Sequence, residues 1–236
     1  MGLMNDRLRD LYETYWDSYL EHIRFNPDLT AAFPFLIFVP KEYEAADFKV
    51  MFCGEETQGW GGEFENKPNV TVRNLQSIYN GFVNGNGYNS PYWNFQRRII
   101  SNHSHCGYIR NNIVKIGKKR QAGCDENIDR LTRKYFPVFK RELEILRPDL
   151  IIFLSGTGVY DWKIKLALGA FKKISMSDKF TFERLEFADP EIPHAIRLNH
   201  PAWLQRKRLY WPAINRLNRY MSDMQIDGKY NGSVTQ

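Results

Sequence analysis

The chain has 236 residues, which is enough for one large domain or two small ones. Hydrophobic residues make up 43% and aromatic residues 15%, a composition that supports a buried core and excludes global disorder. Lys and Arg outnumber Asp and Glu by 33 to 27, so the net charge at pH 7 is +6 and a polyanion is a candidate partner.

The cysteines and the apolar runs bear on the compartment. Cys53, Cys106 and Cys124 make an odd number without paired spacing, which is typical of a reduced setting. Nothing near the N-terminus resembles a signal peptide, and no apolar run approaches membrane-spanning length. We therefore expect a cytoplasmic protein, monomeric and without a membrane partner.

The first half of the chain predicts three helices and one strand. Apolar residues at helical spacing over 3–24 indicate an amphipathic helix that lies on a core. The β-prone run 48–53 predicts a buried strand, which ends at a glycine. Thr71 is placed to cap a second helix, and Pro91 is typical of the first turn of a third.

The second half alternates strands and helices. Residues 107–117 are β-branched and aromatic between glycines, which favours a strand. Asp125 is placed to cap a helix that Pro137 should bend or restart. The apolar run in PDLIIFLSGTG predicts a fully buried strand. The remaining predicted elements are a helix over 158–168, strands near 171–176, 180–187 and 194–198, and a helix over 204–221.

This order of elements predicts an α/β fold. Strands separated by helices favour a mostly parallel sheet that is covered on both faces. We find no repeat, low-complexity tract or linker, so we expect one domain over 1–236. Within it, 1–47 is an N-terminal helical extension and 222–236 is a polar tail.

Three predicted strands end in polar loops. They run into Gly54-Glu55-Glu56-Thr57, into Asn111-Asn112 and into Asn199-His200-Pro201. In open parallel sheets, ligands bind beyond the carboxyl ends of the strands. We therefore expect two carboxylates, one or two amides and a histidine to converge at one edge of the sheet.

The order of four motifs resembles the uracil-DNA glycosylase superfamily, in particular its divergent branches. The motifs are VMFCGEETQGW, YIRNNIVKIG, FPVFKRELEILRPDLIIFLSGTG and LNHPAWLQRKR, and together they run from about residue 48 to 218. The resemblance implies a three-layer α/β/α sandwich with a short, mostly parallel central sheet. It also implies a DNA glycosylase that hydrolyses the bond between the sugar and uracil, or a related altered base, in base-excision repair.

The resemblance also implies roles for the residues at the strand ends. Glu56 falls in the position of the water-activating residue, and Glu55 in the neighbouring position, whose main chain faces the base. Asn112 takes the place of the amide that reads the flipped base, and His200 matches the histidine that assists its departure. Either Phe64 or Trp60 is implied as the aromatic residue that stacks on the base.

Further residues are expected to contact DNA. Trp203 and Leu204 match the residues that push into the duplex. The basic runs KIGKKR and QRKR lie beside the second and fourth motifs and are placed to contact phosphates. Lys115, Arg206 and Lys207 are the candidates from these runs.

The chain also departs from the family pattern. Thr57 stands where the family has proline, and Glu56 is one methylene longer than the usual aspartate. A catalytically inactive nucleic-acid-binding protein is therefore the alternative, and a fold relative that acts on another nucleotide or a small ligand is a third hypothesis. The cysteines of the iron–sulfur branch are missing, and His103-Ser104-His105-Cys106 with Cys124 matches no strong zinc pattern, so no cofactor is expected.

Overall fold

A computed structural model describes residues 2–26, 31–57, 60, 69–85, 87–118, 125–158 and 160–231, with side chains up to residue 225. The helices among them are α1 (Leu3–Arg24), α2 (Lys41–Ala45), α3 (Val72–Val83), α4 (Pro91–Asn102), α5 (Glu126–Tyr135), α6 (Phe139–Leu146), α7 (Asp161–Leu168), α8 (Pro201–Arg206) and α9 (Tyr210–Asn231). The strands are β1 (Lys49–Gly54), β2 (Gly107–Asn112), β3 (Leu150–Phe153), β4 (Phe171–Ser175), β5 (Phe182–Phe187) and β6 (His194–Leu198).

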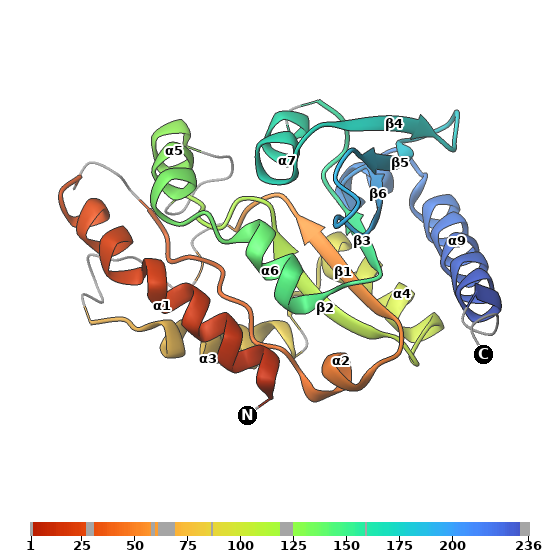
Figure 1. The fold of residues 1–236 in the computed structure, drawn as a ribbon. Coiled ribbons are helices and arrows are strands. Elements are labelled where there is room, and N and C mark those ends of the chain that lie inside the picture. The colour runs from red at the N-terminus through yellow and green to blue at the C-terminus, as the bar shows by residue number, and fades with distance from the viewer. Residues whose placement is uncertain are drawn as a thin grey trace.

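The described strands form one six-stranded sheet in the order β2-β1-β3-β6-β5-β4. The first four strands in this order are parallel, and β5 and β4 continue the sheet in antiparallel pairing. Helices cover both faces (Figure 1). The expected α/β sandwich with a mostly parallel sheet is confirmed.

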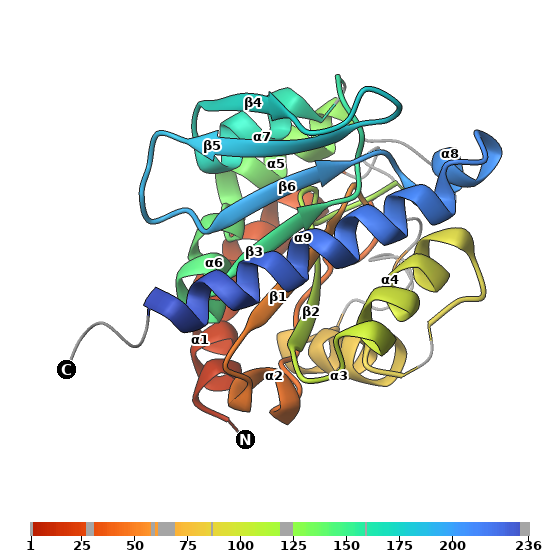
Figure 2. The same ribbon diagram turned by 90° about the vertical axis from the view of Figure 1, so that its right-hand side faces the viewer.

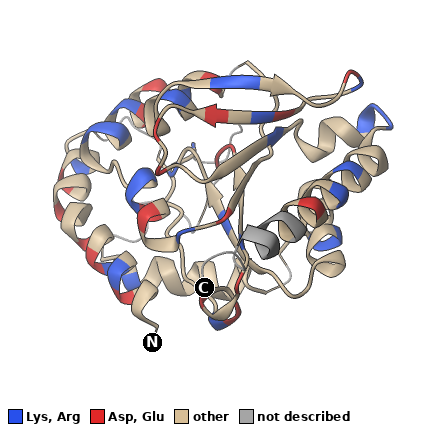
Figure 3. Cartoon of the chain, turned by 45° about the vertical axis from the view of Figure 1, so that its right-hand side comes forward, with Lys and Arg blue, Asp and Glu red and all other residues tan. Residues whose placement is uncertain are grey.

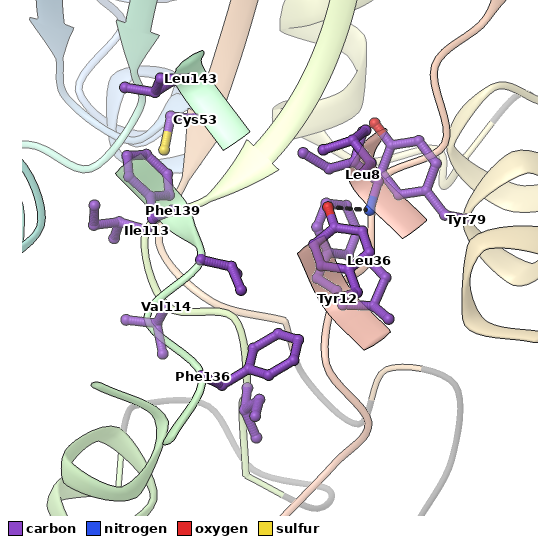
Figure 4. Packing of buried hydrophobic residues seen from close by; sticks show 14 of the residues in the cluster. Leu8, Tyr12, Leu36, Cys53, Tyr79, Ile113, Val114, Phe136, Phe139 and Leu143 are labelled. Atoms are coloured by element: carbon purple, nitrogen blue, oxygen red, sulfur yellow. Dashed lines mark hydrogen bonds between the residues drawn. The ribbon is translucent and has the colours of Figure 1, made fainter. Parts of the chain in front are cut away.

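Alternation along the strands divides the core into two clusters. Met51 and Cys53 of β1 point into the cluster beneath α1, α3, α5, α6 and α7, whereas Val50 and Phe52 point into the cluster beneath α4, α8 and α9. Figure 2 shows α9 crossing the second face, with α4 beside it. Figure 4 shows part of the first cluster, where Cys53 lies beside helix α6.

Helix α1 is an integral layer of the core. Leu8, Tyr12 and Tyr19 are fully buried in the first cluster, and α1 packs against α3, α5 and α6. The segment before β1 therefore belongs to the sandwich and is not an appended extension. The predicted stripe of apolar residues is the physical reason, because burying it stabilises a helix of this length far more than propensity does.

Most predicted helix boundaries are confirmed. Thr71 forms a capping box with Asn74, Asp125 accepts bonds from the first turn of α5, and α5 and α6 are separated around Pro137. The short helix α2 was not predicted.

The prediction of a single last helix over 204–221 was wrong. The chain turns at Arg208, which has a left-handed φ of +59°, and so separates α8 from α9. The polar tail expected from residue 222 is helical to Asn231. Beyond residue 221, Met224 packs against the second cluster, so the hydrophobic face of the helix continues past the predicted end.

A buried polar network supports the end of β2. The Lys115 ammonium lies 2.6 Å from the Glu142 carboxylate, and both side chains are nearly inaccessible, at 2% and 0% exposed. Lys115 also donates to the Asn111 side-chain oxygen at 2.5 Å, and Tyr12 donates to Glu142 at 2.6 Å. The network joins α1, α6 and β2, so the loop after Asn112 is held from below.

Among the described residues, no helix combines the length and the apolar character needed to cross a lipid bilayer.

Candidate active site

The carboxyl ends of the four parallel strands meet at one edge of the sheet, as predicted. Gly54 at the end of β1 pairs in register with Asn112 at the end of β2. Phe153 at the end of β3 pairs with Cys53 on one side and with Arg197 on the other. The loops that carry the carboxylates, the amide and the histidine therefore start from adjacent positions.

Two side chains closely approach the backbone at Gly54. A Cβ atom at this position would lie 2.5 Å from the Tyr92 hydroxyl oxygen and 2.6 Å from the Asn112 side-chain oxygen. Both distances are well below van der Waals contact, so only glycine fits here. The glycine that ends the strand therefore makes room for a phenol and an amide above the backbone.

The two carboxylates follow directly. The Glu55 carbonyl accepts the Val114 N–H at 3.0 Å, which ties this loop to the segment after β2. The Tyr160 hydroxyl donates to the Glu56 carboxylate. Burial, and to a smaller extent the negative charge of Glu56, raise the pKa of Glu55 to about 7, while the Tyr160 hydroxyl opposes the shift. Glu55 therefore exchanges its proton near neutral pH.

His200 caps helix α8 with its side chain. Its Nδ1 accepts the Ala202 backbone N–H at 3.2 Å, so in the neutral ring the proton is on Nε2. Burial lowers the pKa of His200, the charge of Arg206 lowers it further, and Glu56 opposes both. The imidazole is therefore neutral at pH 7 and has one N–H to donate.

Tyr92 orders the imidazole from the other side. Its ring stacks on that of His200 with centroids 5.5 Å apart and an interplanar angle of 14°. Tyr92 follows Pro91 in the first turn of α4, and the proline fixes where this turn begins. The histidine is thus held by a backbone bond and a ring contact, which gives it a defined orientation.

The two adjacent asparagines have different environments. Asn111 belongs to the buried network, where its side-chain nitrogen donates to Glu142 at 2.9 Å and its oxygen accepts from the Asn112 backbone N–H at 2.8 Å. Asn112, on the opposite side of the strand, places its oxygen above Gly54. The structure therefore brings Asn112, and not Asn111, to the edge with the carboxylates.

The structure contradicts two of the predicted DNA contacts. Lys115 is buried in its ion pair with Glu142, so it is not available to a phosphate. Leu204 is fully buried in the second core cluster and is not available to enter a duplex. In both cases the local path of the chain turns the side chain inward.

The other predicted DNA contacts lie on α8 and just after it. Arg206 and Lys207 are exposed, and Trp203 is half-buried against the second cluster. Trp60 makes edge contacts with Phe35 and Phe82, at centroid distances of 4.8 and 5.5 Å. Its ring therefore packs against the first core cluster and is not an exposed stacking ring. The alternative stacking residue, Phe64, lies outside the described residues.

Three residues at the edge were not predicted from the sequence. Tyr92 contacts His200, and Tyr160 contacts Glu56. The third residue is Ser155 in the loop after β3, whose hydroxyl is buried without a hydrogen-bond partner among the described residues. Ser155 follows a buried strand and precedes Gly156, a strand-end signal of the kind that identified Glu55. The tyrosines come from helix starts that carry no comparable signal.

The histidine-rich segment gives no metal site among the described residues. The rings of His103 and His105 have centroids 6.2 Å apart, and Gln225 donates to the Cys106 sulfur at 2.8 Å. No group of three His, Cys, Asp or Glu residues within the described ranges is placed to hold a metal ion. Cys124 lies outside those ranges.

The function has to be argued from this geometry, because neither the models of known protein families nor the curated protein sequences include a match to the chain.

Proposed function

We propose that the protein is a DNA glycosylase that hydrolyses the N-glycosidic bond of uracil or a related altered base flipped out of DNA. The observation that carries the proposal is the convergence of Glu56, Asn112 and His200 beside Gly54, with the histidine neutral. This set combines a carboxylate, an amide and a neutral N–H donor, which are the groups that this hydrolysis needs.

His200 is suited to assist the leaving base. When the bond between the sugar and the base breaks, the bonding electrons go to the base, and negative charge develops on its ring nitrogen and its carbonyl oxygens. The Nε2–H of His200 is the donor for that charge, because Nδ1 is already occupied by the Ala202 N–H. A donor placed in advance at such a position stabilises the transition state without reorganisation.

Glu56 is suited to act on the sugar and on water. Its carboxylate is oriented by the Tyr160 hydroxyl. In the proposed reaction it orients a water molecule whose oxygen bonds to the sugar carbon, and it accepts the proton that the water loses. Its negative charge also stabilises the positive charge that develops on the sugar, as in glycosidases.

Asn112 is suited to read the base. An amide offers one acceptor oxygen and two donor hydrogens, so it pairs with the edge of uracil and leaves unpaired groups against cytosine. Because the network around Asn111 supports the end of β2, this reading group is held by a rigid strand. Flipping the base out of the duplex costs a few kcal/mol, and contacts between the protein and the DNA strand must offset this cost.

The test is base release from oligonucleotides that each carry one altered base. We would incubate the protein with DNA containing uracil, hypoxanthine, mismatched thymine or an oxidised base, single- and double-stranded, and measure the free base by mass spectrometry. The proposal predicts release from at least one substrate and loss of that release in Glu56→Ala. Absence of release from every substrate would exclude it.

A binding protein without catalysis is the second candidate. The observation that favours it is the hydrogen bond from Tyr160 to Glu56, which occupies one side of the carboxylate. Thr57, the departure from the family pattern, also buries its hydroxyl without a hydrogen-bond partner among the described residues. This candidate predicts salt-sensitive binding of altered DNA with no free base, and it predicts that Tyr160→Phe does not create activity.

A further inference from the structure

A basic groove lies next to the candidate active site. Its volume is about 780 Å³, and it lies between α4 and the segment that joins α8 to α9. Arg97 and Arg98 line it from α4, and Arg208, Tyr210 and Trp211 line it from the other side. The run QRKR, which was expected to contact phosphates, contributes Gln205 and Arg208 to this groove, whereas Arg97, Arg98 and Trp211 have no role in the proposed reaction.

The charge around the groove has one sign. Helix α4 contains Arg97 and Arg98, the following segment contains Arg206, Lys207 and Arg208, and the sequence has no Asp or Glu in 91–102 or in 201–211. None of the described residues that line the groove is acidic. Figure 3 shows basic residues at the turn between α8 and α9. A concentration of cationic groups without carboxylates favours a polyanion.

The groove also has an exposed aromatic ring. Trp211 is 56% exposed, and the Arg98 guanidinium lies over its ring at 5.5 Å. A large flat ring next to cationic groups is what sequence-tolerant binding of single-stranded nucleic acid requires, because every base has a face that stacks.

Two connections join the groove to the active-site edge. Tyr210 donates to the Pro91 carbonyl at 3.3 Å, and Pro91 is followed by Tyr92, which stacks on His200. Helix α8 starts after His200 and carries Gln205 in the groove, so at 1.5 Å per residue the two lie about 7.5 Å apart along the helix. That length corresponds to about two nucleotides of a B-form strand.

We infer that this groove binds the DNA strand next to the flipped nucleotide, with Trp211 stacking on an unpaired base and Arg98 and Arg208 contacting phosphates. The inference rests on the proposed function for the identity of the ligand. It goes further in naming the strand segment and the residues that hold it. It also explains why α8 ends in a sharp turn at Arg208, which presents three basic residues in succession.

The test measures binding without catalysis. We would titrate the full chain into a fluorescently labelled single-stranded oligonucleotide that carries no altered base, and follow anisotropy at several salt concentrations. Trp211→Ala should weaken binding about tenfold, within the range for one base–aromatic stack. Arg98→Gln should weaken binding and lower the magnitude of the salt slope by about 0.7, the value for one phosphate contact on a single strand.

The chain offers a matched control. Trp162 is also exposed, at 41%, and lies beneath the Arg133 guanidinium at 5.6 Å. It lies in the first turn of α7, however, and α7 packs on the opposite face of the sheet from α4 and α9. Trp162→Ala should bind like wild type. Both Trp211 and Trp162 are surface residues, so circular dichroism of each variant should match the wild type and exclude unfolding as the cause.

The outcomes separate the groove from the proposed activity. Wild-type binding by Trp211→Ala and Arg98→Gln, or an equal loss in Trp162→Ala, would overturn the inference. Tighter binding of RNA than of DNA of the same sequence would overturn the assignment of the ligand to DNA. Groove-dependent binding by a protein that releases no base would contradict the glycosylase proposal alone.

Discussion

Gly54 is the residue on which the geometry of the candidate site depends most. The Tyr92 hydroxyl and the Asn112 oxygen both lie over its Cα, at distances that exclude a side chain. A methyl group here must displace a phenol held by ring stacking or an amide held at a strand end. The end of β1 is therefore adapted to the groups above it.

The first prediction follows from this close approach. Gly54→Ala should lower the free energy of unfolding by about 1–3 kcal/mol, the usual cost of overpacking, as measured by urea denaturation. Gly81, inside α3, is the matched control, because a Cβ there meets nothing within 4 Å. Gly81→Ala should stabilise the protein by about 0.5–1 kcal/mol. Equal effects of the two substitutions would contradict the geometry at Gly54.

Glu55 gives a prediction about pH. Its pKa is raised from 4.5 to about 7 on folding, so between these values the folded protein binds more protons than the unfolded chain. Stability should therefore fall as pH rises from about 4.5 to about 7, and Glu55→Gln should remove this fall. Urea denaturation between pH 4 and pH 8 measures both.

The control for Glu55 is an exposed carboxylate elsewhere. Glu13→Gln, on the exposed side of α1, should leave the pH dependence of wild type in place. If the stability curves of Glu55→Gln and wild type run parallel from pH 4 to pH 8, the environment assigned to Glu55 is wrong.

At the scale of elements, the end of β2 depends on helices far away in the sequence. Lys115 and Glu142 form a buried ion pair, to which Tyr12 of α1 and Asn111 of β2 also contribute. Three elements thus share one polar network beneath the loop that follows Asn112. A buried charge that loses its partner is strongly destabilising, so these elements are expected to unfold together.

The network can be tested by a double-mutant cycle. Lys115→Met should lower the free energy of unfolding by about 3–5 kcal/mol, because it leaves the Glu142 carboxylate buried without a cation. Lys115→Met with Glu142→Gln should lose less than the sum of the single variants. Arg141→Ala, which removes an exposed pair with Glu144, should leave the melting temperature near that of wild type. Additive single effects at Lys115 and Glu142 would contradict the buried pair.

The elements also show what sequence patterns can and cannot predict. Strand ends were predictable, because continuous apolar runs that stop at glycine identify buried parallel strands, and their polar residues then have to meet at one edge. The convergence of Glu55, Asn112 and His200 followed from that rule. Tyr92 and Tyr160 were not predictable, since their placement depends on where separate helices dock on the sheet.

Two errors have the same physical cause. Lys115 and Leu204 sit in motifs that the resemblance associates with DNA, yet both side chains are buried. A motif position specifies the neighbourhood of a residue, whereas the direction of its side chain depends on local turns: the bend at 113–115 for Lys115 and the short helix α8 for Leu204. Such directions come from tertiary packing.

At the scale of the whole molecule, the sheet edge with the candidate active site and the basic groove lie side by side. Helix α8 connects them, with His200 at its start and Arg206 at its end. The antiparallel strands β5 and β4 extend the sheet on the far side from β1 and β2. A strand of DNA that follows the groove would thus reach the carboxylates without crossing the rest of the sheet.

The most direct measurement is the single-turnover rate of base release from the best substrate, for wild type, Glu56→Ala and His200→Ala. The account predicts a loss of at least about 100-fold in each variant, the usual effect of removing an acid–base group or a transition-state donor. Lys172→Ala, exposed on the distant strand β4, should react at the wild-type rate. Release by Glu56→Ala and His200→Ala at the wild-type rate would contradict the assignment of catalysis to this edge of the sheet.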